Sequence, residues 1–122
     1  MSIERVRRQF KELGIEDRIV ELDQSSATVE LAAHALGCQP RDIAKTLAFD
    51  VDGDAIVIVA VGDARIDNAK YKNTFGKKAK MLHGDQVEER TGHAIGGVCP
   101  FGLKEGVKVY LDQSLKQLEY VY

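Results

Sequence analysis

Residues 44–61, with the sequence AKTLAFDVDGDAIVIVAV, decide the fold predicted for this chain. The two sets of alternate side chains along residues 44–51 differ in polarity, as in a strand whose two faces meet different surroundings. Residues 55–61 are apolar at every position, which is typical of a central strand covered on both faces. Asp52 and Gly53 lie between the two runs and are a strong signal for a two-residue hairpin turn. The stretch therefore predicts two antiparallel strands, the second of them central in the sheet.

Helices are predicted on both sides of this hairpin. Capping residues predict two of them, one between Thr28 and Gly37 and one between Asp67 and Gly76, and a third is expected to end at Gly92. Near the N-terminus, apolar residues recur three and four positions apart, which predicts a further helix with one buried stripe (Ile3, Val6, Phe10 and Leu13).

Shorter alternating runs predict strands over residues 18–22, 107–111 and 118–122. The sequence has no internal repeat and no composition typical of a linker. The expected fold class is therefore α/β. A single domain would span residues 1–122, and its one mixed sheet would be largely antiparallel and curled, with the helices packed outside.

The composition of the 122 residues, 44% apolar and 30% charged, fits one globular domain with a single core. No run approaches the roughly eighteen apolar residues of a membrane helix, and the charged N-terminus lacks a signal-peptide core, so a cytoplasmic protein is expected. Cys38 and Cys99 are expected to be free thiols in a reducing compartment. The three histidines lack the spacing of metal ligands, so neither a metal nor a cofactor is predicted.

A second informative stretch is residues 91–103, TGHAIGGVCPFGL, which contains four glycines and one proline. Glycine inside a helix or strand is unfavourable by about 0.5–1 kcal/mol relative to alanine, so this segment is predicted to be a shaped loop. We call residues 91–103 the glycine loop. Its backbone N–H and C=O groups can approach a ligand closely, although the same composition is also typical of a simple connection between a helix and a strand.

Within this loop, Gly96 and Pro100 have the spacing Gly-x-x-x-Pro, and residues 45–47 read Lys-Thr-Leu. Together these motifs resemble the YbaK-type aminoacyl-tRNA editing family, also called the prolyl-tRNA-synthetase-associated domain. The resemblance extends to TVELAAHALG, residues 28–37, and to GDARIDNAKYKNTFG, residues 62–76. It implies a YbaK-like fold and a trans-editing hydrolase that deacylates mischarged tRNA. Members of this family usually continue beyond a strand like residues 118–122, so a C-terminal segment is expected to be missing here.

The resemblance also implies site residues. Lys45 would be catalytic, placing its charge beside the terminal ribose or phosphate or orienting the ester. From the sequence alone, a lysine on an apolar strand face either extends past the end of the strand or enters a cavity. The amides of residues 97–99 would hold the ester carbonyl. The predicted substrate-binding residues are Thr46, His93, Gly96, Gly97, Val98, Cys99, Pro100, Phe101 and Gly102.

The pair Lys45-Thr46 resembles the branch of the family that acts on cysteinyl-tRNA, so a substrate like cysteinyl-tRNA(Pro) is favoured, with its own thiol as the implied attacking group. A prolyl-tRNA synthetase is a further implied partner. Two alternatives stay open. In the first, the chain is a non-catalytic module that binds a tRNA end or a synthetase. In the second, it is a thiol hydrolase for small esters in which His93 activates Cys99.

The charge distribution predicts where nucleic acid binds. The whole chain has a formal net charge of −2, but residues 65–80 hold six basic residues against one acid, Asp67. A local basic strip of this kind suits a short run of phosphates such as a tRNA end, although it is equally typical of a solvated helix face. The predicted tRNA-binding residues are Arg65, Lys70, Lys72, Lys77, Lys78 and Lys80.

Overall fold

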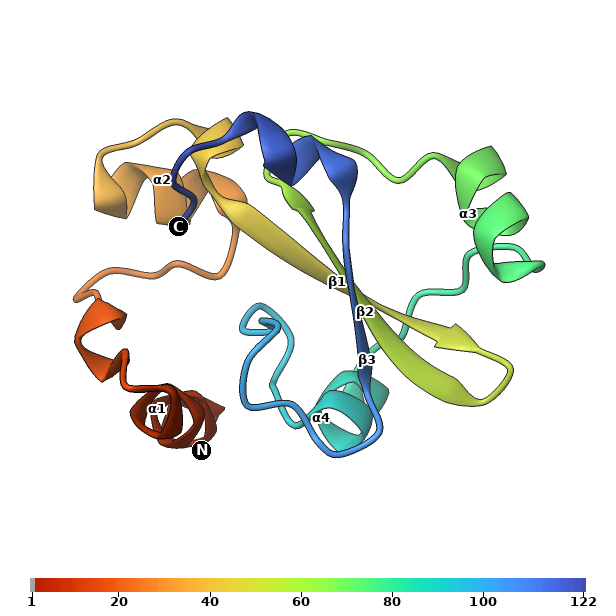
Figure 1. Ribbon diagram of the computed structural model, residues 1–122, viewed down its shortest axis with the longest axis horizontal. Coiled ribbons are helices and arrows are strands. Elements are labelled where there is room, and N and C mark those ends of the chain that lie inside the picture. The colour runs from red at the N-terminus through yellow and green to blue at the C-terminus, as the bar shows by residue number, and fades with distance from the viewer. Residues whose placement is uncertain (1) are drawn as a thin grey trace.

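The computed structural model describes residues 2–122, and the predicted hairpin lies at its centre (Figure 1). Strands β1 (Ala44–Val51) and β2 (Asp54–Val61) pair antiparallel along their whole length. Their turn contains Asp52 with φ of 54° and Gly53 with φ of 89°, the two positive values that a tight hairpin turn needs. This confirms the hairpin that residues 44–61 predict.

The third strand, β3 (Lys108–Leu111), pairs parallel to β2 and gives the strand order β1-β2-β3. Phe49 of β1 also forms an isolated antiparallel bridge to Met81. The sheet is therefore mixed and largely antiparallel, and it is open rather than closed into a barrel. Together with the surrounding helices it confirms the predicted α/β fold class.

Several α-helices begin and end at the capping residues that predicted their limits. Thr28 accepts the N–H of Leu31 at the start of α2, and Asp67 accepts two amides at the start of α3. Gly37, Gly76 and Gly92 each end a helix in the left-handed conformation. The helices are α1 (Ser2–Leu13), α2 (Val29–Leu36), α3 (Asn68–Phe75) and α4 (Asp85–Thr91), with 3-10 helices η1 (Glu16–Arg18), η2 (Pro40–Asp42) and η3 (Gln113–Gln117).

Two predicted strands are absent from the described chain. Arg18 is the last residue of η1, and residues 19–22 pair with no other strand, because an alternating pattern makes a suitable surface but does not supply a neighbouring strand. Residues 118–122 follow η3, and only Tyr122 makes strand-like contacts: its carbonyl accepts the N–H of Ala44 at 2.7 Å, and its N–H donates to Asp42 at 2.9 Å.

The two faces of the sheet are covered by different elements. On one face, α3 packs its buried Tyr71 against Phe49 and Ile56, in a cluster that we call the aromatic face. On the opposite face, Val87 of α4 packs against Ala48 and Val57 with part of the glycine loop, and we call this the loop face. Figure 1 shows α3 and α4 on separate sides of the strands.

A close backbone contact positions α2 beside the sheet. A Cβ added to Gly62, directly after β2, would lie 2.2 Å from the carbonyl oxygen of Pro40 and 2.6 Å from Cγ1 of Val29. Only glycine allows these segments to approach so closely. The N-terminal end of α2 is therefore held beside the start of β1. Among residues 2–122, no helix is long and apolar enough to cross a membrane.

Candidate functional site

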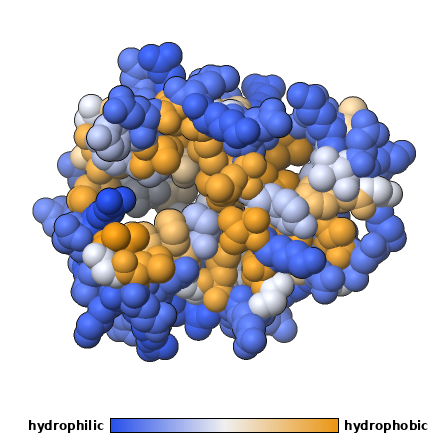
Figure 2. All heavy atoms as spheres, viewed as in Figure 1, coloured by the Kyte–Doolittle hydropathy of each residue, from blue (hydrophilic) through white to orange (hydrophobic). Residues whose placement is uncertain are grey.

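A cavity of about 490 Å³ lies on the loop face, between β1, the start of α2 and the glycine loop. Figure 2 shows the molecule hollowed on this side, with hydrophobic residues around the hollow. The walls come from segments far apart in the sequence, namely residues 26–29 and 32, 43–48, 81–83 and 87, and 95, 96 and 98. Tertiary packing therefore brings the Lys-Thr-Leu motif and the Gly-x-x-x-Pro loop to one cavity.

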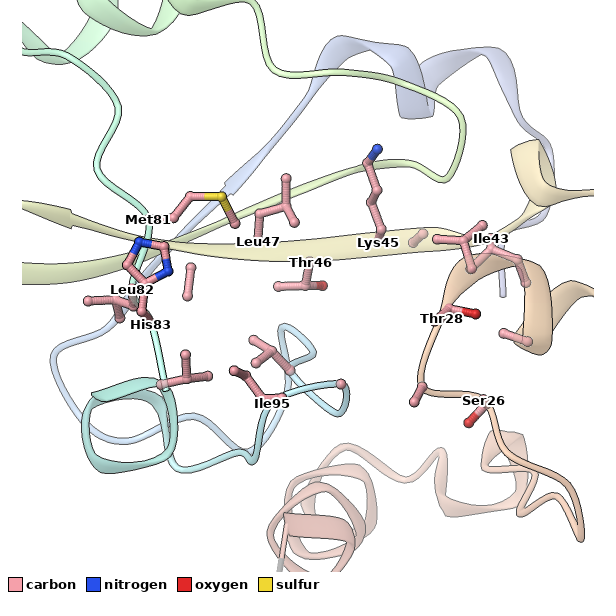
Figure 3. Close-up of a pocket in the computed structure, with 18 residues that line it drawn as sticks. Ser26, Thr28, Ile43, Lys45, Thr46, Leu47, Met81, Leu82, His83 and Ile95 are labelled. Carbon is pink, nitrogen blue, oxygen red and sulfur yellow. The ribbon is translucent and has the colours of Figure 1, made fainter. Parts of the chain in front are cut away.

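The polar side chains of this cavity are mostly hydroxyls. Thr46 points from β1 toward the side where Ile95 of the glycine loop lies (Figure 3), and it makes no side-chain hydrogen bond to the described residues. Thr28 accepts the N–H of Leu31 at 3.1 Å, which leaves its hydroxyl hydrogen available to a ligand. Ser26 adds a third hydroxyl. None of the described lining residues carries a carboxylate, and the three hydroxyls are neutral donors and acceptors within largely apolar walls.

Lys45 lines the same cavity, but its ammonium is bound on the other side of β1. Its Nζ donates to the carbonyl of Ala64, and Figure 3 shows the side chain directed away from Ile95 while Thr46 is directed toward it. The reason is alternation, since Lys45 shares the face of β1 that carries Leu47 and the aromatic face. In this conformation the ammonium is held at the loop that follows β2.

The glycine loop contributes Ile95, Gly96 and Val98 to the cavity wall. The N–H of Gly97 donates to Ala94 at 2.9 Å and is therefore occupied within the loop. The amides of Val98 and Cys99 make no hydrogen bond to any residue from 2 to 122. Of the three predicted carbonyl-binding amides, those of Val98 and Cys99 thus have no partner among residues 2–122, and Val98 lines the cavity.

His93 and Cys99 lie together behind this wall. His93 is fully buried, and its Nε2 lies 2.6 Å from the carbonyl of Phe101, which fixes the hydrogen on Nε2 because a carbonyl only accepts. The thiol of Cys99 donates to the same carbonyl at 3.3 Å and lies 3.7 Å from His93 Nε2. Burial raises the pKa of Cys99, so it is a neutral thiol at neutral pH. Since His93 Nε2 already carries a hydrogen, it has no lone pair to activate this thiol.

The predicted substrate-binding set divides in two. Thr46, Gly96 and Val98 line the cavity, whereas other predicted residues lie outside its lining (His93, Gly97, Cys99, Pro100, Phe101 and Gly102). Sequence reasoning missed Ser26, Thr28 and His83 as lining residues. Thr28 was recognisable only as a helix cap, and nothing in the sequence around His83 signals that it lies beside β1.

The predicted tRNA-binding residues do not line this cavity. Arg65, the lysines of α3 and those of residues 77–80 are exposed, and α3 packs on the aromatic face rather than the loop face. Lys77 forms an ion pair with Asp52 at 2.5 Å. Helix α3, which carries Lys70 and Lys72, and the cavity thus lie on opposite sides of the sheet, whereas Lys80 directly precedes Met81 of the cavity lining. No cluster of metal-binding side chains occurs in the part of the chain that the structure describes.

Comparisons with known proteins place these features in a family. A family model of the aminoacyl-tRNA editing domain matches residues 23–122. The chain is 50% identical over 123 residues to the uncharacterized protein YwhH of Bacillus subtilis, covering all of this chain and 78% of that protein. It is 31% identical over 103 residues to a proline–tRNA ligase of Lysinibacillus sphaericus, covering 84% of this chain but only 18% of the ligase.

Solved structures support the same family. A candidate trans-editing enzyme for prolyl tRNA synthetase superposes with a TM-score of 0.84 at 32% identity, over 96% of this chain and 75% of that one. The hypothetical protein APE2540 superposes with a TM-score of 0.87 at 30% identity, over 97% of this chain and 79% of that one. From the matched residues, the shared fold and the motifs around its cavity, the chain belongs to the aminoacyl-tRNA editing domain family.

Proposed function

We propose that this chain is a trans-editing deacylase, which hydrolyses the ester between a wrongly attached amino acid and the 3′ end of a tRNA. The observation that carries the proposal is a cavity to which β1 and the glycine loop both contribute, in a chain of the editing family. Its hydroxyls and the free amide of Val98 are donors that suit an ester carbonyl and a ribose.

In the proposed reaction, a nucleophile attacks the ester carbonyl carbon, and the bond from that carbon to the ribose oxygen breaks. With water as the nucleophile, the products are a free amino acid and a tRNA whose ribose oxygen has regained a proton. The Val98 amide would stabilise the oxygen that becomes negative. The half-buried, protonated thiol of Cys99 is not the nucleophile in this scheme.

We further propose cysteinyl-tRNA(Pro) or a similar substrate, with the tRNA 3′ end and a prolyl-tRNA synthetase as partners. Thr46 supports this preference because its side chain is directed into the cavity directly after Lys45. A pocket that distinguishes small side chains does so by only about 1–3 kcal/mol per group. One wall residue is therefore enough to change the preferred amino acid.

A deacylation panel tests the proposal. Cysteinyl-, alanyl- and seryl-tRNA would be offered to the chain, and loss of the ester would be followed over time. Faster loss of cysteine from tRNA(Pro) than of the other amino acids is expected. Loss of no ester above the uncatalysed rate, from a folded protein, would contradict the proposed activity.

Lys45 is the proposed catalytic residue, and it would have to leave the Ala64 carbonyl to meet the substrate. Substitution Lys45→Met keeps the length and apolar contacts of the side chain but removes the ammonium. Loss of one charged hydrogen bond, about 1.5–3 kcal/mol, predicts a rate lower by roughly ten- to hundredfold. The exposed Lys116→Met in η3, outside the cavity and the predicted tRNA-binding strip, is the matched control. Unchanged rates for Lys45→Met would remove this residue from the catalytic role.

One observation favours a non-catalytic module that binds a tRNA end or a synthetase. The ammonium of Lys45 is bound outside the cavity, and His83 is the remaining described lining residue that can carry a positive charge. Stable binding of aminoacyl-tRNA without loss of the ester, measured by filter binding alongside the panel, would select this alternative.

A further inference from the structure

Helix α1 contacts the glycine loop at Gly102 with two side chains. Gln9 Oε1 accepts the N–H of Gly102 at 2.6 Å, and Arg5 Nε donates to the carbonyl of Gly102 at 2.7 Å. Arg5 and Gln9 are four residues apart, so they project from the same face of the helix. Both backbone polar groups of one loop residue are therefore satisfied by α1, 93 and 97 positions away in the sequence.

Close packing accompanies these hydrogen bonds. A Cβ added to Gly102 would lie 2.7 Å from the carbonyl carbon of Arg5 and 2.8 Å from the backbone nitrogen of Val6. The ring of Phe10, only 9% exposed, meets Phe101 edge-on at 4.6 Å between centroids. The backbones of α1 and the loop are thus in direct contact, and a side chain at position 102 would push them apart.

The same part of the loop is fixed from within. The carbonyl of Phe101, next to Gly102, accepts Nε2 of His93 and the thiol of Cys99. The peptide group between Phe101 and Gly102 is therefore held from both sides, its carbonyl by His93 and Cys99 and its N–H by Gln9 of α1. The opposite part of the loop reaches across to the segment before α2, where a Cβ on Gly96 would lie 3.2 Å from Cβ of Ala27.

From these contacts we infer that α1 is a positioning element for the glycine loop. Arg5, Gln9 and Phe10 hold the loop at its outer end, and through it they place the Val98 amide at the cavity wall. They are positioning residues rather than catalytic ones, since none of them lines the cavity. The consequence for turnover rests on the proposed deacylase function, whereas the consequence for the order of the loop does not.

The extent of the family match sharpens this inference. The editing-domain model matches residues 23–122, so α1, which ends at Leu13, lies outside the matched region. The cavity itself is built entirely from residues 26–98. An element outside the matched domain therefore controls the shape of a site within it.

Two measurements on the full chain test the inference, with Gln9→Ala as the main variant. The first is hydrogen exchange at the Gly97 amide, which bonds to Ala94 within the loop and does not touch α1. Faster exchange at Gly97 is expected in Gln9→Ala, because loosening at Gly102 would reach the cavity side. Unchanged exchange at Gly97 would overturn the inference.

The second measurement is the deacylation rate. Gln9→Ala should lower kcat by between about ten- and hundredfold with little change in KM, because the displaced Val98 amide acts mainly in the transition state. A rise in KM alone would contradict this role. If the parent chain is inactive on every aminoacyl-tRNA, the proposed function fails, and the exchange measurement alone decides the inference about α1.

Matched variants separate positioning from general damage. Gln9→Glu keeps an acceptor oxygen at the same distance and should restore both the slow exchange and most of the rate. Arg8→Ala removes an exposed side chain from the same helix and should behave as the parent chain does. If Gln9→Ala unfolds, Arg5→Lys replaces it, since lysine retains a positive donor but not the guanidinium geometry. Equal effects of Arg8→Ala and the Gly102-contacting variants would also overturn the inference.

Discussion

The two faces of the sheet differ in how their apolar residues are used. On the aromatic face, Phe49, Tyr71 and Phe75 follow one another at centroid distances of 5.1 Å and 4.6 Å, and Phe49 is 1% exposed. On the loop face, α4 covers only one part of the strands, and the start of β1 borders a cavity of about 490 Å³. One face is filled with side chains, whereas the other has a cavity bordered by α4, the glycine loop and the start of α2.

This difference indicates how a small sheet combines stability with a site. Dense packing on one face supplies apolar burial, so that the opposite face can leave space unfilled. The supports of the hollow face are individual polar contacts and glycines, such as Arg90 with Asp50, and Gly62 and Gly102 at close backbone approaches. Substitutions on the aromatic face should therefore affect stability most, and those near the cavity should affect turnover most.

The largest effect on stability is expected for Phe49→Ala. Removal of a buried aromatic ring should lower the free energy of unfolding by about 3–5 kcal/mol, because the ring contacts are lost and a void remains. Urea unfolding of the variant would measure this difference. Leu111→Ala, at a side chain that is 70% exposed on β3, is the control and should change stability little. Similar losses for both variants would remove the proposed contrast between packed and open regions.

A smaller loss is expected for Gly62→Ala. The added Cβ would meet the carbonyl of Pro40, so η2 and the start of α2 must shift, at about 1–3 kcal/mol of stability. The same shift moves Thr28 at the cavity, so this variant should lose turnover as well as stability. Thermal unfolding would measure the loss of stability, and the deacylation panel would measure the loss of turnover. Full activity in a destabilised variant would show that the cavity tolerates movement of α2.

A pH-dependent effect is expected for the ion pair that fastens α4 to the hairpin. The N–H of Gly53 and then Arg90 lower the pKa of Asp50, so its carboxylate stabilises the fold above about pH 4, the ordinary range of aspartate. This contribution is lost as the pH falls through the lowered pKa. Asp50→Asn keeps the shape without the charge. The free energies of unfolding of parent and variant, measured at several pH values, should converge in acid. A difference that stays constant with pH would contradict a stabilising role of the Asp50 carboxylate.

The smallest effect is expected for Cys99→Ser. A serine hydroxyl can donate to the Phe101 carbonyl as the thiol does, so the deacylation rate should change by no more than roughly twofold, or about 0.5 kcal/mol. Because burial raises the pKa of Cys99, alkylation by iodoacetamide should be slow at neutral pH and accelerate only in alkaline solution. Rapid labelling at neutral pH, or complete inactivation of folded Cys99→Ser, would restore this thiol as a nucleophile.

Much of the local structure was predictable from the sequence. The Asp52-Gly53 turn, the Thr28 and Asp67 caps and the glycine ends of the helices were all readable, because each depends on the backbone angles and short-range hydrogen bonds of a few neighbouring residues. The pairing of residues 44–51 with 54–61 follows from the same local rules. The run at 18–22 failed as a strand since strand formation also needs a partner.

The candidate site was only partly predictable, and the reason is distance along the chain. Thr46 and the glycine loop could be named from their motifs, but the sequence did not place Ser26 or His83 beside them. It also did not show that α3, which carries Lys70 and Lys72, lies across the sheet from the cavity. Such relations depend on which face each element covers, and that is settled only when the whole core packs.

The sequence by itself thus determined the hairpin, the helix ends and the motifs of the editing family, because those features are written in neighbouring residues. Only the tertiary structure decided where the ammonium of Lys45 is bound, which loop amides stay free and which helix holds the loop. The contact between Arg5 and Gly102 joins residues 97 positions apart. Nothing local specifies such a contact, because it depends on the packing of α1 against a loop whose glycine leaves room for it.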